Sequence, residues 1–301
     1  YILSRFKRKL FPAKEMLARF EDLRYEIRRS SLLEKMLHSE KSGVSSEKYC
    51  DHEVVVSLTS YGKRLYEVGI TIESIMQQSM LPNRIILNLY TEDVAVSLPI
   101  ALQRQIKRGL EVHLVSTDIR SYKKLIPTLK RFPDAVIITI DDDCIYEYDL
   151  VERLFNSYLK NPHSVSAVRT HSILLDKNGK PLPYHKWDSC SAYASKGNRL
   201  FFTGVGGVLY PPGAFNDEVF NEEAFMSLAP YADDVWFHAM ALLNGTSIVK
   251  APAHSGDDID HIENSAVQDI GLVNRNCNIE RENDKQIKAI YDRYDIYPLL
   301  K

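Results

Sequence analysis

The spacing of hydrophobic residues changes near residue 50. Before that point, Met16, Phe20, Leu23 and Ile27 are separated by four, three and four residues. This spacing places them on one face of a helix. Residues 1–49 are therefore predicted to form an amphipathic helical extension.

After residue 52, short apolar runs alternate with helical stretches. The strand-length runs are "EVVVSLTSY" (53–61), "RIILNLY" (84–90), "LEVHLVST" (110–117) and "AVIITI" (135–140), all rich in β-branched residues. Helical spacing follows the first run over 65–76, and a second helix is expected over 98–108. Strands that alternate with helices predict an α/β fold with a mainly parallel, open sheet flanked by helices.

Composition and charge argue against a polyanion-binding protein. The chain has 301 residues, of which 45% are hydrophobic and 26% charged, and its net charge is -2. Without an excess positive field we expect no nucleic acid partner. Residues 1–49 differ, because they carry twelve Lys/Arg against seven Asp/Glu. This basic extension can pack on its own domain or a partner chain, or rest on an anionic membrane surface.

The cysteines and the lack of long apolar runs favour the cytoplasm. Four cysteines lie far apart and form no CxxC pair, so neither a zinc knuckle nor a disulfide framework is indicated. No apolar run approaches the roughly 18–20 residues that span a bilayer, and no signal peptide is evident. The sequence begins at Tyr1, which is compatible with a missing upstream targeting segment. We expect a cytoplasmic protein, either free or peripheral at the inner face of the membrane.

Three consecutive carboxylates stand at the end of an apolar strand. In "VIITIDDDCIY" (136–146), Asp141, Asp142 and Asp143 directly follow the strand, at the edge where open α/β sheets bind ligands. Clustered carboxylates raise one another's pKa unless a cation neutralises them. Magnesium and manganese suit such a site, because they bind one or two carboxylates together with diphosphate oxygens. The alternative is a solvated acidic turn that caps a helix starting near Tyr148.

The order of motifs resembles one enzyme family. "VVVSLTSYGKR", then "TIESIMQQSMLPNRIIL", the strand that ends in "DDD" and a later "ADDVW" look like a GT-A-fold glycosyltransferase of the family 2-like kind, over about residues 53–250. The resemblance implies a catalytic domain over 50–301, with a nucleotide-sugar-binding half (50–150) and an acceptor-binding half (151–301). It further implies a nucleoside-diphosphate sugar donor, with a UDP-sugar as first choice, a glycan or lipid-linked glycan acceptor, and Mn²⁺ or Mg²⁺ as cofactor.

The resemblance also assigns donor-binding residues. The base and ribose would lie against the loop after the first strand, which contains Thr59, Ser60 and Tyr61. Arg64 would lie close by. Lys124, or its neighbour Lys123, would reach a phosphate, although "SYKKLIP" can equally be a basic helix start.

Metal ligands are expected in the triplet and near the C-terminal end. The resemblance makes Asp143 the direct metal ligand, Asp141 a ribose or metal contact, and Asp142 part of the donor site. His254, after an expected strand, is the third candidate ligand. His261 is a further candidate, and either histidine can instead be a surface or hydrogen-bonding residue.

A second acidic pair supplies a candidate base. "YADDVWFHAMALLNG" (231–245) predicts a helix that begins at Asp233 and Asp234, where aspartates also serve as caps. An inverting sugar transfer needs a carboxylate that accepts the proton of the attacking hydroxyl. The resemblance implies that Asp234 is this base and that Asp233 positions the acceptor or the base. A retaining mechanism would leave the pair with a structural role.

Glycines interrupt an apolar stretch in the middle of the chain. In "RLFFTGVGGVLYPPGAF" (199–215), Gly204, Gly206 and Gly207 indicate either a close approach of the backbone to a ligand or tight packing against a neighbouring element.

Two other functions fit parts of this pattern. A sugar-phosphate nucleotidyltransferase would carry a glycine-rich basic loop after its first strand, whereas "LTSYGKR" has one glycine. A catalytically silent glycosyltransferase-like subunit could bind a nucleotide or glycan and join a glycan-assembly complex through residues 1–49. Carboxylates at both the metal and the base positions favour an enzyme of the hexosyltransferase type.

Overall fold

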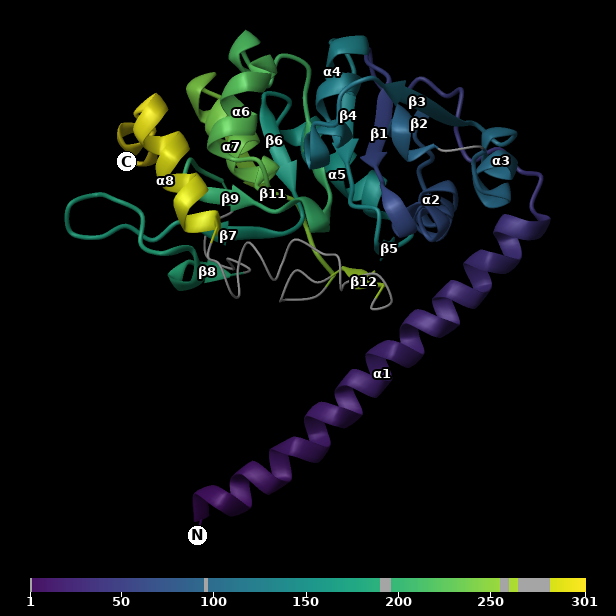
Figure 1. Cartoon of the computed structure of the whole chain (residues 1–301), viewed down its shortest axis with the longest axis horizontal. Coiled ribbons are helices and arrows are strands. Elements are labelled where there is room, and N and C mark those ends of the chain that lie inside the picture. The colour runs from purple at the N-terminus through teal and green to yellow at the C-terminus, as the bar shows by residue number, and fades with distance from the viewer. Residues whose placement is uncertain (1, 95–96, 190–195, 255–259, 265–281) are drawn as a thin grey trace.

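The computed structural model describes residues 2–94, 97–189, 196–254, 260–264 and 282–301. A long helix, α1 (Ile2–His38), comes first and runs out from a layered α/β body (Figure 1). All other labelled elements belong to that body.

A seven-stranded sheet forms the centre of the body, in the order β11-β6-β10-β4-β1-β2-β3. Its strands are β1 (Val54–Thr59), β2 (Arg84–Tyr90), β3 (Leu110–Val115), β4 (Val136–Thr139), β6 (Ser164–Ala167), β10 (Val208–Tyr210) and β11 (Ser247–Lys250). All neighbouring strands pair in parallel except β10, which is antiparallel to both β4 and β6. The topology confirms the predicted α/β fold with a mainly parallel open sheet flanked by helices.

Helices cover both faces of the sheet. They are α2 (Val68–Met76), α3 (Ile100–Ile106), α4 (Ile126–Arg131), α5 (Leu150–Lys160), α6 (Glu222–Leu228), α7 (Asp233–Leu243) and α8 (Glu282–Tyr294). Alternate strand residues point to opposite faces, so Val55 packs with Trp236 of α7 in one core, while Val54 packs with Ile72 of α2 in the other. Helices α2, α3 and α5 contribute to the second core, and α4, α6, α7 and α8 to the first.

Short strands complete the body. β5 (Cys144–Tyr146) pairs with β12 (His261–Glu263), and β7 (Thr170–Ser172) lies between β8 (Asp188–Ser189) and β9 (Leu200–Phe202). The predicted apolar stretch 199–215 is thus divided into β9, a 3₁₀ turn over Gly204–Gly206 and β10. Because Val208 pairs with Thr139, the last residue of β4, this turn lies at the carboxyl edge of the parallel strands.

Helix α1 confirms the predicted helical extension but docks through an unpredicted face. Tyr25, Leu32 and Met36 are buried and pack with Ile70 of α2 and Ile145 of β5. The predicted stripe that begins at Met16 is exposed, so of the contacts considered for the extension, this face does not make the one with its own domain. In the described part of the chain, no helix is both long and apolar enough to cross a bilayer.

Candidate active site

The three aspartates follow β4 at the carboxyl edge of the sheet, as predicted, and Asp142 is the buried anchor among them. Its carboxylate accepts hydrogen bonds from Ser60 Oγ (2.6 Å) and Arg64 Nη1 (2.7 Å). Its backbone carbonyl accepts another from Thr71 Oγ1 (3.0 Å). Burial raises the pKa of Asp142 to about 6, against the opposing charge of Arg64. Asp142 therefore ties the loop after β1 to the loop after β4.

The outer aspartates of the triplet have separate cationic partners. Arg64 Nη2 lies 3.0 Å from Asp143 Oδ2, so one guanidinium bridges Asp142 and Asp143. Lys124 Nζ lies 3.0 Å from Asp141 Oδ1. The carboxylates on either side of Asp142 are thus held by cations from two different segments.

The second acidic pair opens α7, which begins at Asp233 as predicted. Asp234 Oδ2 accepts a hydrogen bond from the amide of Gly204 (2.9 Å), and Asp233 Oδ2 lies 2.9 Å from Lys124 Nζ. Burial raises the pKa of Asp234 to about 7, while Lys124 lowers it and Asp233 raises it further. A carboxylate with a pKa near neutrality suits a general base, because it can both take and release a proton at that pH.

Gly204 lies where the aspartate triplet after β4 meets the Asp233–Asp234 pair of α7. A Cβ atom on this residue would stand 2.6 Å from Lys124 Nζ, 3.1 Å from Asp234 Oδ1 and 3.4 Å from Asp141 Oδ1. Three charged atoms from separate segments therefore converge on one small space that any side chain at position 204 would fill. At Gly206 the interpretation of tight packing applies, because a Cβ there would stand 2.6 Å from Arg169 Cβ.

The aspartate triplet after β4 and the Asp233–Asp234 pair line one cavity at this edge. Its volume is about 530 Å³, which is within the size range of small-molecule sites. Thr59 and Tyr61 line it from the loop after β1, and Lys123 and Lys124 from the 3₁₀ turn before α4. Sequence reasoning did not single out the remaining basic, acidic and aromatic wall, which includes Arg120, Arg169, Glu263, Tyr184, Phe201 and Tyr231.

The predicted donor residues take different positions at this cavity. Thr59 Oγ1 donates a hydrogen bond to the carbonyl of Asn88 in β2 (2.7 Å). Ser60 is buried beneath the loop, where it holds Asp142. Tyr61 is 42% exposed, and its ring centroid lies 5.9 Å from the Arg64 guanidinium. Tyr61 is therefore the side chain of this loop that is most open to a ligand.

The structure distinguishes the two candidate lysines. Lys123 pairs with Asp118, whereas Lys124 pairs with both Asp141 and Asp233. Nearby ion pairs hold the pKa of Lys124 well above its usual range despite burial. Lys124 is therefore a fixed cation between the aspartate triplet after β4 and the Asp233–Asp234 pair.

Two carboxylates of the triplet suit a divalent ion. Asp141 and Asp143 line the same cavity and offer oxygen ligands, which Mg²⁺ and Mn²⁺ prefer. The described residues contain no cluster of three His, Cys, Asp or Glu side chains able to hold a metal. An ion at Asp141 and Asp143 would accordingly need donor oxygens or water to complete its coordination.

The two candidate histidines lie apart from Asp141 and Asp143, the candidate metal ligands. His254 Nε2 is 2.9 Å from Asp149, the residue before α5, and His254 is not among the residues that line the cavity. His261 is buried in β12, with Nε2 3.6 Å from Glu263 Oε1. The structure thus does not bring either ring to Asp141 and Asp143 as a further ligand.

An unpredicted set of contacts joins the lysine turn to the segment before α7. Tyr122 donates its hydroxyl to the carbonyl of Ala229 (2.7 Å), and Arg120 Nη1 donates to that of Pro230 (3.3 Å). The Arg120 guanidinium also lies 4.1 Å from the ring centroid of Tyr231. These contacts fix Lys124 relative to α7, and no local sequence signal would have revealed them.

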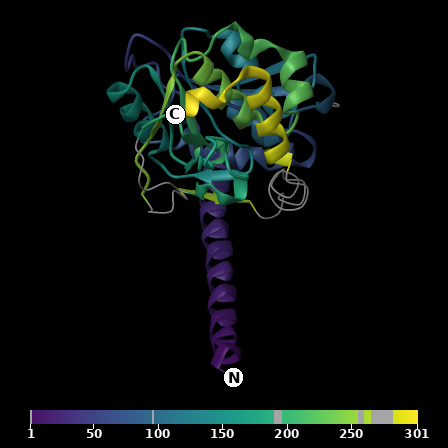
Figure 2. The same ribbon diagram turned by 90° about the vertical axis from the view of Figure 1, so that its left-hand side faces the viewer.

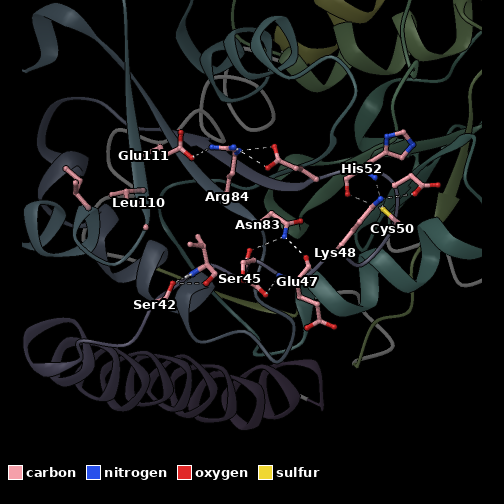
Figure 3. A pocket seen from close by; sticks show the side chains of 16 residues that line it. Ser42, Ser45, Glu47, Lys48, Cys50, His52, Asn83, Arg84, Leu110 and Glu111 are labelled. Atoms are coloured by element: carbon pink, nitrogen blue, oxygen red, sulfur yellow. Dashed lines mark hydrogen bonds and ion pairs between the residues drawn. The ribbon is translucent and has the colours of Figure 1, made fainter.

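A second, more open cavity of about 900 Å³ lies at the amino ends of β1, β2 and β3 (Figure 3). Arg84 is paired there with both Glu53 and Glu111, and Asn83 donates hydrogen bonds to the carbonyls of Ser45 and Glu47. The charged and polar groups of this second cavity thus already form ion pairs and hydrogen bonds with one another. Ligands of open α/β sheets also gather at the opposite edge of the sheet. The candidate site is therefore the 530 Å³ cavity.

Solved structures with a similar arrangement of elements share little sequence with this chain. A mannosyltransferase from Pyrobaculum calidifontis in complex with GDP-Man and Mn²⁺ is 14% identical, with a TM-score of 0.41, over 77% of this chain and 62% of that one. CMP:2-keto-3-deoxy-manno-octonic acid synthetase complexed with CTP is 12% identical, with a TM-score of 0.36, over 67% of this chain and 89% of the synthetase.

A third such structure is glucosyl-3-phosphoglycerate synthase from Mycobacterium tuberculosis in complex with Mn²⁺, UDP and phosphoglyceric acid. It is 17% identical, with a TM-score of 0.30, over 39% of this chain and 43% of that one. No protein-family model matches the chain, and no curated protein matches its sequence. At these identities the similarities concern the fold.

Proposed function

We propose that this chain is a metal-dependent glycosyltransferase that moves a hexose-type sugar from a nucleoside-diphosphate donor, first of all a UDP-sugar, to a hydroxyl of a glycan or lipid-linked glycan. The observation that carries the proposal is the convergence of Asp141, Asp234 and Lys124 on the space above Gly204. A carboxylate triplet for the donor and a base for the acceptor thereby face the same small volume.

The base would act on the acceptor side. The acceptor oxygen attacks the anomeric carbon, the bond from that carbon to the diphosphate oxygen breaks, and the diphosphate leaves with the bonding electrons. Asp234 takes the proton of the attacking hydroxyl, because its raised pKa of about 7 lets it hold that proton once the bond has formed. Attack from the face opposite the leaving group inverts the anomeric centre.

The donor would lie across the loops after β1 and β4. Tyr61, with Arg64 beneath it, offers a surface for the base, and Asp141 a contact for the ribose. Lys124, a buried cation already placed between acidic groups, would approach the diphosphate. A divalent ion held by Asp141 and Asp143 would stabilise the charge of the departing diphosphate.

The runner-up is a silent glycosyltransferase-like subunit that binds a nucleotide or glycan. The raised pKa of Asp234 favours an enzyme, because strongly shifted pKa values in a cavity cluster at catalytic sites. In either case we place residues 1–49 as an extension that contacts a protein or an anionic membrane surface, and the glycosyltransferase-like domain at 50–301 in the cytoplasm.

Thermal unfolding tests the donor site directly. Nucleoside diphosphates and nucleotide sugars should increase the free energy of unfolding by mass action, by about 2.7 kcal/mol at a ligand concentration 100 times Kd, and so raise the melting temperature. We expect one nucleotide to do so with Mn²⁺ and not with chelator. Asp143→Ala should abolish the shift, whereas Asp51→Ala, a highly exposed aspartate at the opposite edge, should leave it unchanged.

Turnover separates the two candidates. Release of free nucleoside diphosphate that depends on added acceptor supports a transferase, and binding without release under any acceptor supports the silent subunit. A native protein that no nucleotide stabilises, with or without metal and acceptor, would contradict the donor site and favour the silent subunit in the form that binds a glycan.

A further inference from the structure

Helix α1 carries two apolar faces, and only one of them is covered by its own domain. Tyr25, Leu32 and Met36 are buried on the docked face. The second face carries four large side chains, with exposed fractions of 70%, 58%, 56% and 61%: Met16, Phe20, Leu23 and Ile27. At 3.6 residues per turn the two faces lie on opposite sides of the helix. Large exposed apolar stripes of this kind mark interaction sites.

The exposed stripe is self-complementary. Its spacing of four, three and four residues reads the same in both directions, and it matches the alternation of seam positions in a coiled coil. When two copies of α1 lie antiparallel with the two-fold axis between residues 21 and 22, Met16 of each meets Ile27 of the other, and Phe20 meets Leu23. Every stripe residue then has an apolar partner.

The flanking charges select the antiparallel arrangement. Arg19 and Glu26 stand one residue before Phe20 and Ile27, and both are exposed. In the antiparallel pair, Arg19 of each copy faces Glu26 of the other, which gives two attractive contacts. In a parallel pair, Arg19 would instead face Arg24 of the second copy. Arg24 itself lies 3.8 Å from Glu147 of its own domain.

An anionic lipid surface fits this stripe less well. Residues 16–27 contain two basic side chains against three acidic ones, so the stripe region has no positive excess to attract lipid headgroups. The densest run of basic residues in the extension lies before the stripe, with four Lys/Arg over residues 5–9. We propose that the exposed face of α1 binds a second copy of this chain as an antiparallel, two-fold helix pair.

The position of the body allows this pairing. Helix α1 extends from the body toward its N-terminus (Figure 2). Because each body docks on the face opposite the stripe, the second copy approaches from the open side, and its body lies on the far side of its own helix. Four side chains from each copy make a short interface, so the dimer should dissociate measurably on dilution.

Light scattering coupled to size exclusion tests the pair in the full chain. The native protein should approach twice its mass of 34.5 kDa as its concentration rises, and Leu23→Glu should stay monomeric. Leu114→Glu is the matched control, because Leu114 has the same exposed fraction of 56% but lies on β3, away from α1. It should dimerise like the native protein, and unchanged circular dichroism would show that both variants fold.

Charge reversal tests the orientation. Arg19→Glu and Glu26→Arg should each weaken the dimer, and the double variant should restore it, because the exchanged charges meet again only in the antiparallel pair. A native protein that is monomeric at every concentration, or a dimer that Leu23→Glu leaves intact, would overturn the proposal. So would a monomer whose stripe instead binds phosphatidylserine vesicles and loses them in Leu23→Glu.

Discussion

The ammonium of Lys124 lies 2.9 Å from a carboxylate oxygen of Asp233, which joins the turn before α4 to the first turn of α7. The same ammonium lies 3.0 Å from Asp141. One buried cation therefore sets the distance between the proposed donor aspartates and the proposed base.

Removal of that cation should impair catalysis more than folding. Lys124→Met should lower turnover by about 100-fold, because small misplacements of reacting groups cost about that much. It should also move the pH profile to higher pH, since Lys124 lowers the pKa of Asp234. Steady-state kinetics across pH would show both effects. Lys123→Met, in the same turn but paired with Asp118, should change turnover far less, and equal losses in the two variants would contradict this role.

The pH dependence should report Asp234. With a pKa of about 7, its basic form increases as pH rises through neutrality, so turnover should climb to a plateau above that pH. Asp234→Asn should lower turnover by about 10²- to 10⁴-fold while nucleotide still raises the melting temperature. A flat profile between pH 6 and 8 in the native enzyme would argue against Asp234 as the base.

The same residue should make stability depend on pH. Its folded pKa of about 7 exceeds the ordinary value of 3.8, so the folded state binds the proton more tightly than the unfolded state between those values. Stability from this group is therefore present at low pH and lost as pH rises toward 7. The melting temperature of Asp234→Asn, relative to native, should accordingly be higher at pH 8 than at pH 4.5. A difference in melting temperature between the variant and the native protein that is the same at both pH values would mean that the pKa of Asp234 is not raised.

Gly204→Ala should disable the site without unfolding the protein. The added methyl group would stand 2.6 Å from Lys124 Nζ and displace it, so we expect about a 100-fold loss of turnover with unchanged circular dichroism. Gly69→Ala is the control, because its methyl group meets Met36 and Ala101 far from the aspartates. It should cost some stability and leave turnover unchanged.

Ser60→Ala should uncouple the two donor loops. Loss of its 2.6 Å hydrogen bond to Asp142 should cost about 1.5–3 kcal/mol of stability, as for other hydrogen bonds to charged groups. It should also weaken nucleotide binding measured by calorimetry. Ser57→Ala, in the preceding strand β1, breaks a buried 2.7 Å contact to Thr128 of α4 and should lower stability only. Equal nucleotide affinity in both variants would show that the hydrogen bond between Ser60 and Asp142 does not contribute to nucleotide binding.

Sequence patterns predicted β1, β2, β3, β4 and α7 well, because each is marked by local signals. β4 consists wholly of β-branched residues and β1 is rich in them. Helix α7 has Asp233 and Asp234 in its first turn, where acidic side chains favour the helix dipole. Contacts between distant segments had no such signal. The choice of Lys124 over Lys123, and the pairing of His254 with Asp149, depend on how the turn before α4 and the chain after β11 pack in three dimensions.

The reversed direction of β10 has a consequence for how this site is assembled. A parallel strand in the same place would start at the far edge of the sheet and send its preceding turn away from the aspartates. Because β10 begins beside the end of β4, the chain must cross the ligand edge before it enters the sheet. The main-chain amide of residue 204, which only a proline at that position would remove, therefore lies at this edge and can hold Asp234 whatever the neighbouring side chains become.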